Sequence, residues 1–120
     1  MWPTPFTPLF NNGGLGAIEQ AAPTVIAAST MASAATLLPG DPNGSVGHPS
    51  IAIENLTNGW AFCNFGDSGV GAATLNNGVG VPPGSVRIVG MPSSTCYVSV
   101  ILNTGATSGN VRFLRGAGLT

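Results

Sequence analysis

The chain has 120 residues, of which 43% are hydrophobic and only 6% are charged, with a formal net charge of −1 at pH 7. This length suits one domain, and three basic residues are too few to follow the phosphate backbone of a nucleic acid. No apolar run reaches the roughly 20 residues of a membrane-spanning helix, and the N-terminus lacks the basic and apolar regions of a signal peptide, so we expect neither a nucleic-acid nor a membrane partner.

Residues 1–22 predict an extended N-terminal arm. Prolines recur within the first eight residues and restrict the backbone, while Trp2, Phe6 and Phe10 are interleaved with them, and 11–14 (Asn-Asn-Gly-Gly) forms a flexible break. Disordered tails are poor in aromatic residues. We therefore expect the three aromatic side chains to anchor the arm on a partner subunit. The alternative is that the arm packs along its own domain.

From residue 23 to residue 120 the sequence predicts an all-β domain. Short runs of β-branched and aromatic residues alternate with Gly, Pro and Asn turns, which is typical of an antiparallel β-sandwich, here expected to be jelly-roll-like. Asn58-Gly59 predicts a tight hairpin turn. The alanines near residue 30 also permit a helix. The expected strands are 24–31 with a weak continuation to 38, 51–56, 60–65, 70–75, 85–89, 95–102 and 110–115.

Alternation along these strands predicts which side chains form the core. The clearest case is 95–102, where Cys96, Val98, Val100 and Leu102 share one face. In 85–89 the apolar residues 86 and 88 share one face of the strand, and the arginine at 87 lies on the other face. The expected core comprises Val25, Ile51, Ile53, Phe62, Val86, Ile88, Val98, Val100 and Phe113.

Titratable residues are too few and too scattered to predict a catalytic site. His48 is the single histidine, and Cys63 and Cys96 lack the paired spacing of metal ligands, so we expect two buried thiols. Glu54 lies on the strand face opposite Ile51 and Ile53, and Asp67 occupies a Gly-rich turn in which it bonds its own backbone. We predict no catalytic, cofactor-binding or metal-binding residues, no cofactor and no enzymatic activity.

The scarcity of charge predicts that other subunits cover much of the surface. Average soluble domains carry about 25% charged residues, and interface cores are depleted in Lys, Glu and Asp. The alternative is an uncharged secreted domain. Arg112 and Arg115 on the last expected strand are candidates for pairing with a neighbouring subunit. They could equally be solvated charges that protect a sheet edge.

Three stretches resemble the small virion proteins of tailed bacteriophages. They are Asn58-Gly-Trp-Ala-Phe-Cys-Asn-Phe-Gly-Asp-Ser-Gly69, Val81-Pro-Pro-Gly-Ser-Val-Arg-Ile88 and Ala106-Thr-Ser-Gly-Asn-Val-Arg-Phe-Leu-Arg-Gly-Ala-Gly118. The resemblance lies in a strand ending in an Asn-Phe-Gly turn, a Pro-Gly strand opener and a final strand closed by Gly-x-Gly. Capsid decoration proteins of this size, also called cement proteins, are commonly jelly rolls or related sandwiches on the outer shell.

The resemblance implies a structural protein located in the virion and assembled in the host cytoplasm. Its expected partners are the major capsid protein and further copies of itself, as a dimer or trimer. Two alternatives stay open: a phage tail or fibre component, and a carbohydrate- or host-surface-binding module. Trp60 and Tyr97 are the aromatic candidates for a sugar site, although their positions in expected strands favour packing.

Overall fold

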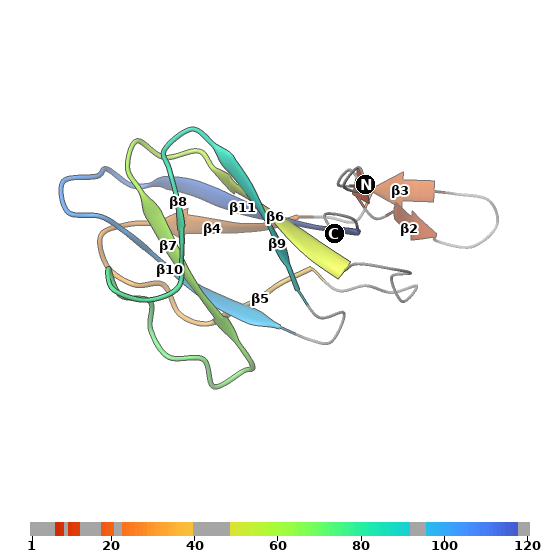
Figure 1. Ribbon diagram of the computed structural model, residues 1–120, viewed down its shortest axis with the longest axis horizontal. Helices are drawn as coiled ribbons and strands as arrows, with labels where there is room; N and C mark the ends of the chain where they lie inside the picture. Colours follow the sequence, from red (N-terminus) through yellow and green to blue (C-terminus); the bar gives the residue numbers. More distant parts are fainter. Residues whose placement is uncertain are drawn as a thin grey trace, which may run out of the picture.

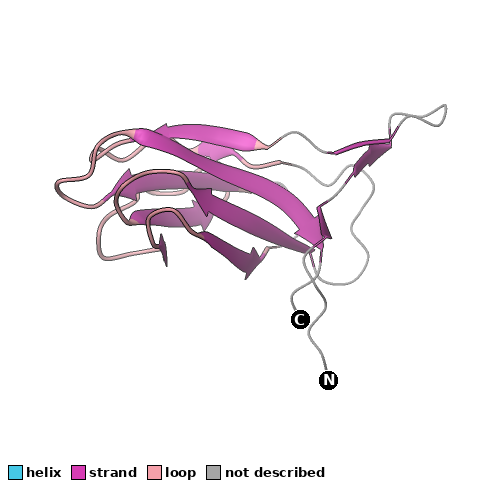
Figure 2. Ribbon diagram, turned by 90° about the horizontal axis from the view of Figure 1, so that it is seen from above, coloured by secondary structure: helices cyan, strands magenta, loops and turns pink. Residues whose placement is uncertain are grey.

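The computed structural model describes residues 7–8, 10–12, 18–20, 23–39, 49–91 and 96–117. These residues form β-strands and loops, and no helix occurs among them (Figure 2). The all-β prediction is therefore confirmed, and the alanines near residue 30 do not form a helix. The strands are β1 (Thr7–Pro8), β2 (Phe10–Asn12), β3 (Ile18–Gln20), β4 (Thr24–Ala28), β5 (Thr36–Leu37), β6 (Pro49–Asn55), β7 (Ala61–Gly66), β8 (Val79–Val81), β9 (Val86–Gly90), β10 (Tyr97–Leu102) and β11 (Gly109–Ala117).

Most of the strands belong to two antiparallel sheets (Figure 1). In sheet 1, β11 and β6 are central and β9 forms one edge, while β4 and β1 pair with successive parts of the other side of β11. In sheet 2 the order is β5-β10-β7-β8. The strands β2 and β3 pair only with each other among the described residues.

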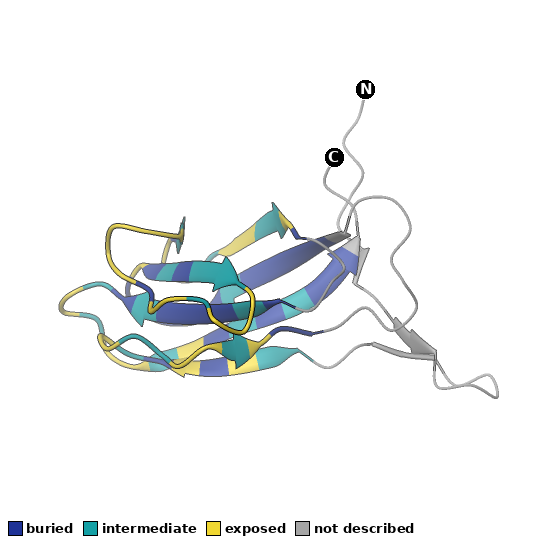
Figure 3. Cartoon of the chain, turned by 90° about the horizontal axis from the view of Figure 1, so that it is seen from below, coloured by how far each residue is buried: buried dark blue, intermediate teal, exposed yellow. Residues whose placement is uncertain are grey.

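The hydrophobic core lies between the two sheets and follows strand alternation. On β11, Val111 and Phe113 are fully buried, whereas Arg112 and Leu114 between and beyond them are partly exposed. Sheet 2 contributes Val98 and other buried residues, and the rings of Phe65 and Phe113 meet edge to face at 6.1 Å across the core. Figure 3 shows the buried positions along the strands of both sheets.

Several expected core residues are confirmed and others are wrong. Ile51, Ile53, Val98, Val100 and Phe113 are fully buried. The remaining expected core residues, which are Val25, Phe62, Val86 and Ile88, lie on the strand faces that point away from the interior. Apolar residues occupy both faces of β4, β7 and β9, so alternation alone could not decide which face is buried.

The turn at 57–59 does not form the predicted hairpin, because β6 belongs to sheet 1 and β7 to sheet 2. The fully buried Asn55 organises this crossing. Its Oδ1 accepts hydrogen bonds from the Thr57 N–H (3.0 Å) and hydroxyl (2.7 Å), and its Nδ2 donates to the carbonyls of Gly59 (2.8 Å) and Val81 (2.9 Å). The Asn55 side chain thereby forms hydrogen bonds with polar groups of the turn and links the turn to β8 through the Val81 carbonyl.

A second crossing leads from β4 to β5 along the edge of β10. Backbone hydrogen bonds join Ser29 to Leu102 (2.8 Å) and Ser33 to Val100 (2.9 Å). The Ser33 Oγ also accepts from the Val100 N–H, at 2.9 Å. The predicted strand 24–38 is therefore divided between the two sheets.

Residues 67–78 form a loop and contain no strand, contrary to the prediction for 70–75. The loop is bonded to sheet 2, since Asn64 Nδ2 donates to the Gly71 carbonyl (3.0 Å) and the Ala73 N–H donates to Ser99 Oγ (3.0 Å). After the loop the chain returns as β8, a strand that the sequence did not predict.

Three short strands fall within the predicted arm. The backbone of Thr7 and Pro8 pairs with Ala117 and Gly116. This pairing joins residues 7–8 to the end of β11, and whether 1–22 form an arm that anchors on a partner stays a prediction.

Candidate partner-binding surface

A row of four side chains crosses the face of sheet 1 that points away from the core. Register places Arg112 opposite Val25 of β4 on one side and opposite Glu54 of β6 on the other, and Glu54 lies opposite Val86 of β9. Directly opposed residues of antiparallel strands point to the same side of the sheet. We call this side, with Val25, Ala52, Glu54, Val86, Ile88, Arg112 and Leu114, the outer face of sheet 1.

The centre of the outer face of sheet 1 is an ion pair. Arg112 Nη1 and Glu54 Oε2 are 3.3 Å apart, and the two side chains are 37% and 24% exposed. A pair this accessible to water stabilises the fold by at most about 1 kcal/mol. Its stronger effect is on the surface itself, since the two opposite charges leave this face with no net charge.

Apolar side chains surround the ion pair. Val25 is 49% exposed and Val86 is 59% exposed, one on each side of the pair. In the neighbouring row, register aligns half-buried Leu114 and Ile88 on either side of Ala52, which is buried. The exposed apolar area of this face therefore comes mainly from the two valines, with smaller contributions from Leu114 and Ile88. The low charge content of the sequence is thus reflected on this face, where exposed valines flank a single neutralised ion pair.

The two predicted interface arginines have different surroundings. Arg112 lies on the outer face of sheet 1, and its role as a partner contact stays a prediction. Arg115 is fully buried, with Nε donating to the Pro39 carbonyl (3.2 Å) and Nη1 to the Met91 carbonyl (3.4 Å). Its assignment as an interface or edge charge is wrong. The signal was available, because residues three apart on a strand face opposite sides.

The aromatic residues expected to anchor the arm cannot be placed on a surface. Trp2 and Phe6 lie outside the described residues. The backbone of Phe10 lies in β2, but its side chain is outside the described part of the structure. Their role as partner contacts stays a prediction.

The described residues offer little chemistry for catalysis or metal binding. Cys63 is buried in the core, and burial raises the pKa of its thiol from 9.0 to about 12, so the reactive thiolate is scarce at neutral pH. Cys63 and Cys96 are not joined in a disulfide. Asp67 Oδ1 accepts from the Gly69 N–H at 2.8 Å, as predicted for a turn residue. No group of three potential metal ligands occurs among the described residues, and His48 lies outside them.

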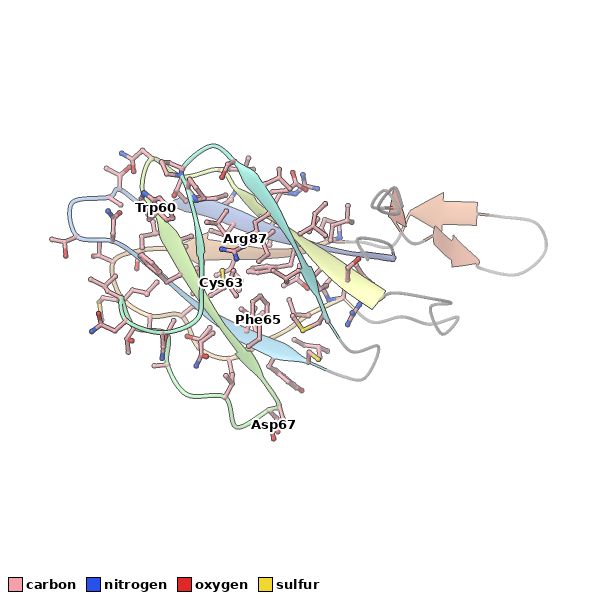
Figure 4. The ribbon with its side chains drawn as sticks, viewed as in Figure 1. Trp60, Cys63, Phe65, Asp67 and Arg87 are labelled. Atoms are coloured by element: carbon pink, nitrogen blue, oxygen red, sulfur yellow. The ribbon has the colours of Figure 1, made fainter. Side chains whose placement is uncertain are left out.

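A second exposed feature is on sheet 2, facing away from the core. Trp60 is 44% exposed, and its ring lies nearly parallel to that of Phe62, with 6.3 Å between centroids and 19° between planes. Trp60 therefore packs against Phe62, as the sequence favoured, but remains partly exposed. Tyr97 is half-buried on β10. Figure 4 labels Trp60 at the start of β7.

Comparison with family models, curated proteins and solved structures finds no match to this chain. Within the described residues no helix is long and apolar enough to span a membrane.

Proposed function

We propose that this protein is a structural virion protein that decorates a bacteriophage capsid and stabilises it by bridging capsid subunits. The observation that carries the proposal is the neutral, apolar outer face of sheet 1. Two further properties support it: the strand order of the two sheets and the scarcity of charge. The location that follows is the virion, and the partner is the major capsid protein.

The strand order supports a jelly-roll sandwich. Each of the four strands β4 to β7 pairs with the strand at the mirror-image position among β8 to β11, in the combinations β4 with β11, β5 with β10, β6 with β9 and β7 with β8. This is the pattern of one long antiparallel ribbon wrapped into two sheets. The further pairs β6–β11 and β7–β10 join the ribbon's turns. Jelly rolls occur in viral capsid proteins and in lectins.

The outer face of sheet 1 suits a protein partner better than solvent. It offers exposed valines at both sides of an internally neutralised ion pair, so docking buries apolar area without stranding an unpaired charge. Many identical sites on a shell would multiply even weak contacts. A dimer or trimer of this protein on the shell is part of the proposal.

Reconstitution on particles tests the proposed function. Purified shells built from the capsid protein alone would be mixed with this protein, sedimented and analysed for copy number by quantitative mass spectrometry. We expect saturable co-sedimentation with a copy number that is a multiple of the capsid lattice number. A small fixed number in whole virions, with no binding to shells, would contradict decoration and favour the alternative of a tail or fibre component.

A further inference from the structure

We propose that Trp60, Phe62 and Arg87 form a glycan-binding site on the side of the molecule remote from the outer face of sheet 1, and that this site prefers acidic sugars. The inference goes beyond the proposed function and rests on different residues.

The two rings form a platform because Gly80 leaves room for them. Gly80 pairs directly with Phe62 across β7 and β8. A Cβ atom at residue 80 would approach Phe62 Cε1 to 3.3 Å and Trp60 Cε3 to 3.4 Å. Both rings therefore reach over the glycine of the edge strand. Half-buried Ile101, opposite Phe62 on β10, extends the apolar surface inward from that edge.

The indole ring of Trp60 is 44% exposed, so part of its apolar surface is open to a ligand. Nearly parallel, neighbouring rings present a flat apolar surface. The C–H face of a pyranose ring is similarly flat and apolar, while its hydroxyl groups point outward toward polar partners. This shape match favours a sugar over a globular protein, whose side chains would need a broader apolar area.

Arg87 supplies the polar partner beside the platform. It extends from β9 of sheet 1, and its Nη1 donates to the carbonyl of Gly80 at 3.0 Å. The guanidinium and the two rings thus meet at the same residue of β8, and Figure 4 shows Trp60 and Arg87 on either side of that strand. Arg87 is exposed, and its guanidinium has no carboxylate within ion-pair distance among the described residues.

The charge of Arg87 determines the preferred class of sugar. A guanidinium has five N–H donors, and the bond to Gly80 uses one of them. The fork of the remaining donors matches a carboxylate, with which arginine forms short, charge-assisted hydrogen bonds. A sugar that carries a carboxylate would stack on Trp60 and pair with Arg87, whereas a neutral sugar would gain the stacking alone.

The position of the site complements the proposed docking surface. The two sheets enclose the core, so their outward faces point in opposite directions. A copy attached to a shell through sheet 1 would present Trp60 and Phe62 to the surroundings. The platform would then contact glycans on a cell surface.

An array of neutral and acidic oligosaccharides, probed with the full-length protein, tests the site. We expect binding to acidic glycans, loss of that binding in Trp60→Ala, and roughly tenfold weaker binding in Arg87→Gln. Neutral glycans that bind should be unaffected by Arg87→Gln. The control is Leu75→Ala, which removes an apolar side chain of similar exposure from the loop 67–78 and should leave binding unchanged.

Tryptophan fluorescence gives a second readout. In a Trp2→Phe background Trp60 is the sole indole, and its emission should change when the best-binding array glycan is added. Absence of binding to every acidic glycan would overturn the proposal. So would weaker attachment of Trp60→Ala to capsid shells together with an empty array, because the platform would then be a protein contact. The first outcome leaves docking through sheet 1 unaffected, whereas the second would also place a shell contact on sheet 2.

Discussion

Arg112 and Arg115 lie three residues apart on β11 and project from opposite sides of sheet 1. Arg112 pairs with Glu54 on the outer face, and Arg115 is enclosed in the interior, where the carbonyls of Pro39 and Met91 accept its hydrogen bonds. Arg112 thus forms a surface ion pair, while Arg115 supplies hydrogen bonds to backbone carbonyls in the interior. The free energy of unfolding of the two alanine variants can distinguish these roles.

Replacing Arg115 should destabilise the fold strongly. Arg115→Ala leaves a cavity and two carbonyls without their donor, so we expect the free energy of unfolding to fall by about 2–4 kcal/mol. Arg112→Ala removes an exposed ion pair and should cost less than about 1 kcal/mol. Urea denaturation of both variants measures the difference. Equal losses would contradict the burial of Arg115.

Charge on the outer face of sheet 1 should weaken attachment to capsid shells. Val25→Lys and Val86→Lys place an unpaired ammonium group where docking would bury it, and we expect a reduction in affinity of roughly tenfold or more. Leu75→Lys is the matched control, since it charges an exposed apolar residue elsewhere. Co-sedimentation of folded variants provides the measurement. Unchanged binding of both valine variants would exclude this face as the docking surface.

Gly78 should be intolerant of any side chain. Its φ of +78° favours glycine, and a Cβ atom would collide with the backbone carbonyl of Cys63. We expect Gly78→Ala to lower the free energy of unfolding by roughly 2–4 kcal/mol. Gly84 has a similar φ of +67° but open space around the missing side chain. Gly84→Ala should therefore cost only about 1 kcal/mol, which thermal or urea unfolding can verify.

The thiol of Cys63 should make stability fall at alkaline pH. Burial raises its pKa from 9.0 to about 12, so between these values the unfolded chain releases a proton that the folded protein retains. Because the unfolded state binds fewer protons, the free energy of unfolding decreases as pH rises through this window. From pH 8 to pH 10 the wild type should lose roughly 1 kcal/mol more than Cys63→Ala. Identical pH profiles would contradict this origin.

Deleting residues 1–10 should leave the domain folded and weaken attachment to particles. The deletion removes the pairing of Thr7 and Pro8 with the end of β11, but the core residues found in the described part of the chain lie beyond residue 25. It also removes Trp2, Phe6 and Phe10, each of which would contribute about 1.5–3 kcal/mol if fully buried at an interface. Circular dichroism and co-sedimentation test the two parts. Loss of folding would assign the arm to its own domain, and unchanged binding would exclude it as an anchor.

The alternation of apolar and polar residues by itself determined the all-β class, most strand positions and the buried face of β10. It also placed Glu54 on the face of its strand that points away from Ile51 and Ile53. These properties are local, since each depends on the two-residue period of a strand. Where only one face of a strand is apolar, as on β10, the sequence also indicates the inside.

Tertiary structure decided which strands pair, and therefore which apolar face is covered. Val86 is exposed and Val89 is half-buried because β9 pairs with β6 in sheet 1, a contact between segments some 35 residues apart that no local pattern specifies. The pairing of distant strands also makes 57–59 a crossing between the two sheets. It aligns the side chains of the outer-face row, which are Val25, Arg112, Glu54 and Val86. It brings Arg87 within hydrogen-bond distance of the Gly80 carbonyl, next to Trp60. Each of these relationships joins distant strands, and the burial of the whole core selects among the alternatives that each strand alone would allow.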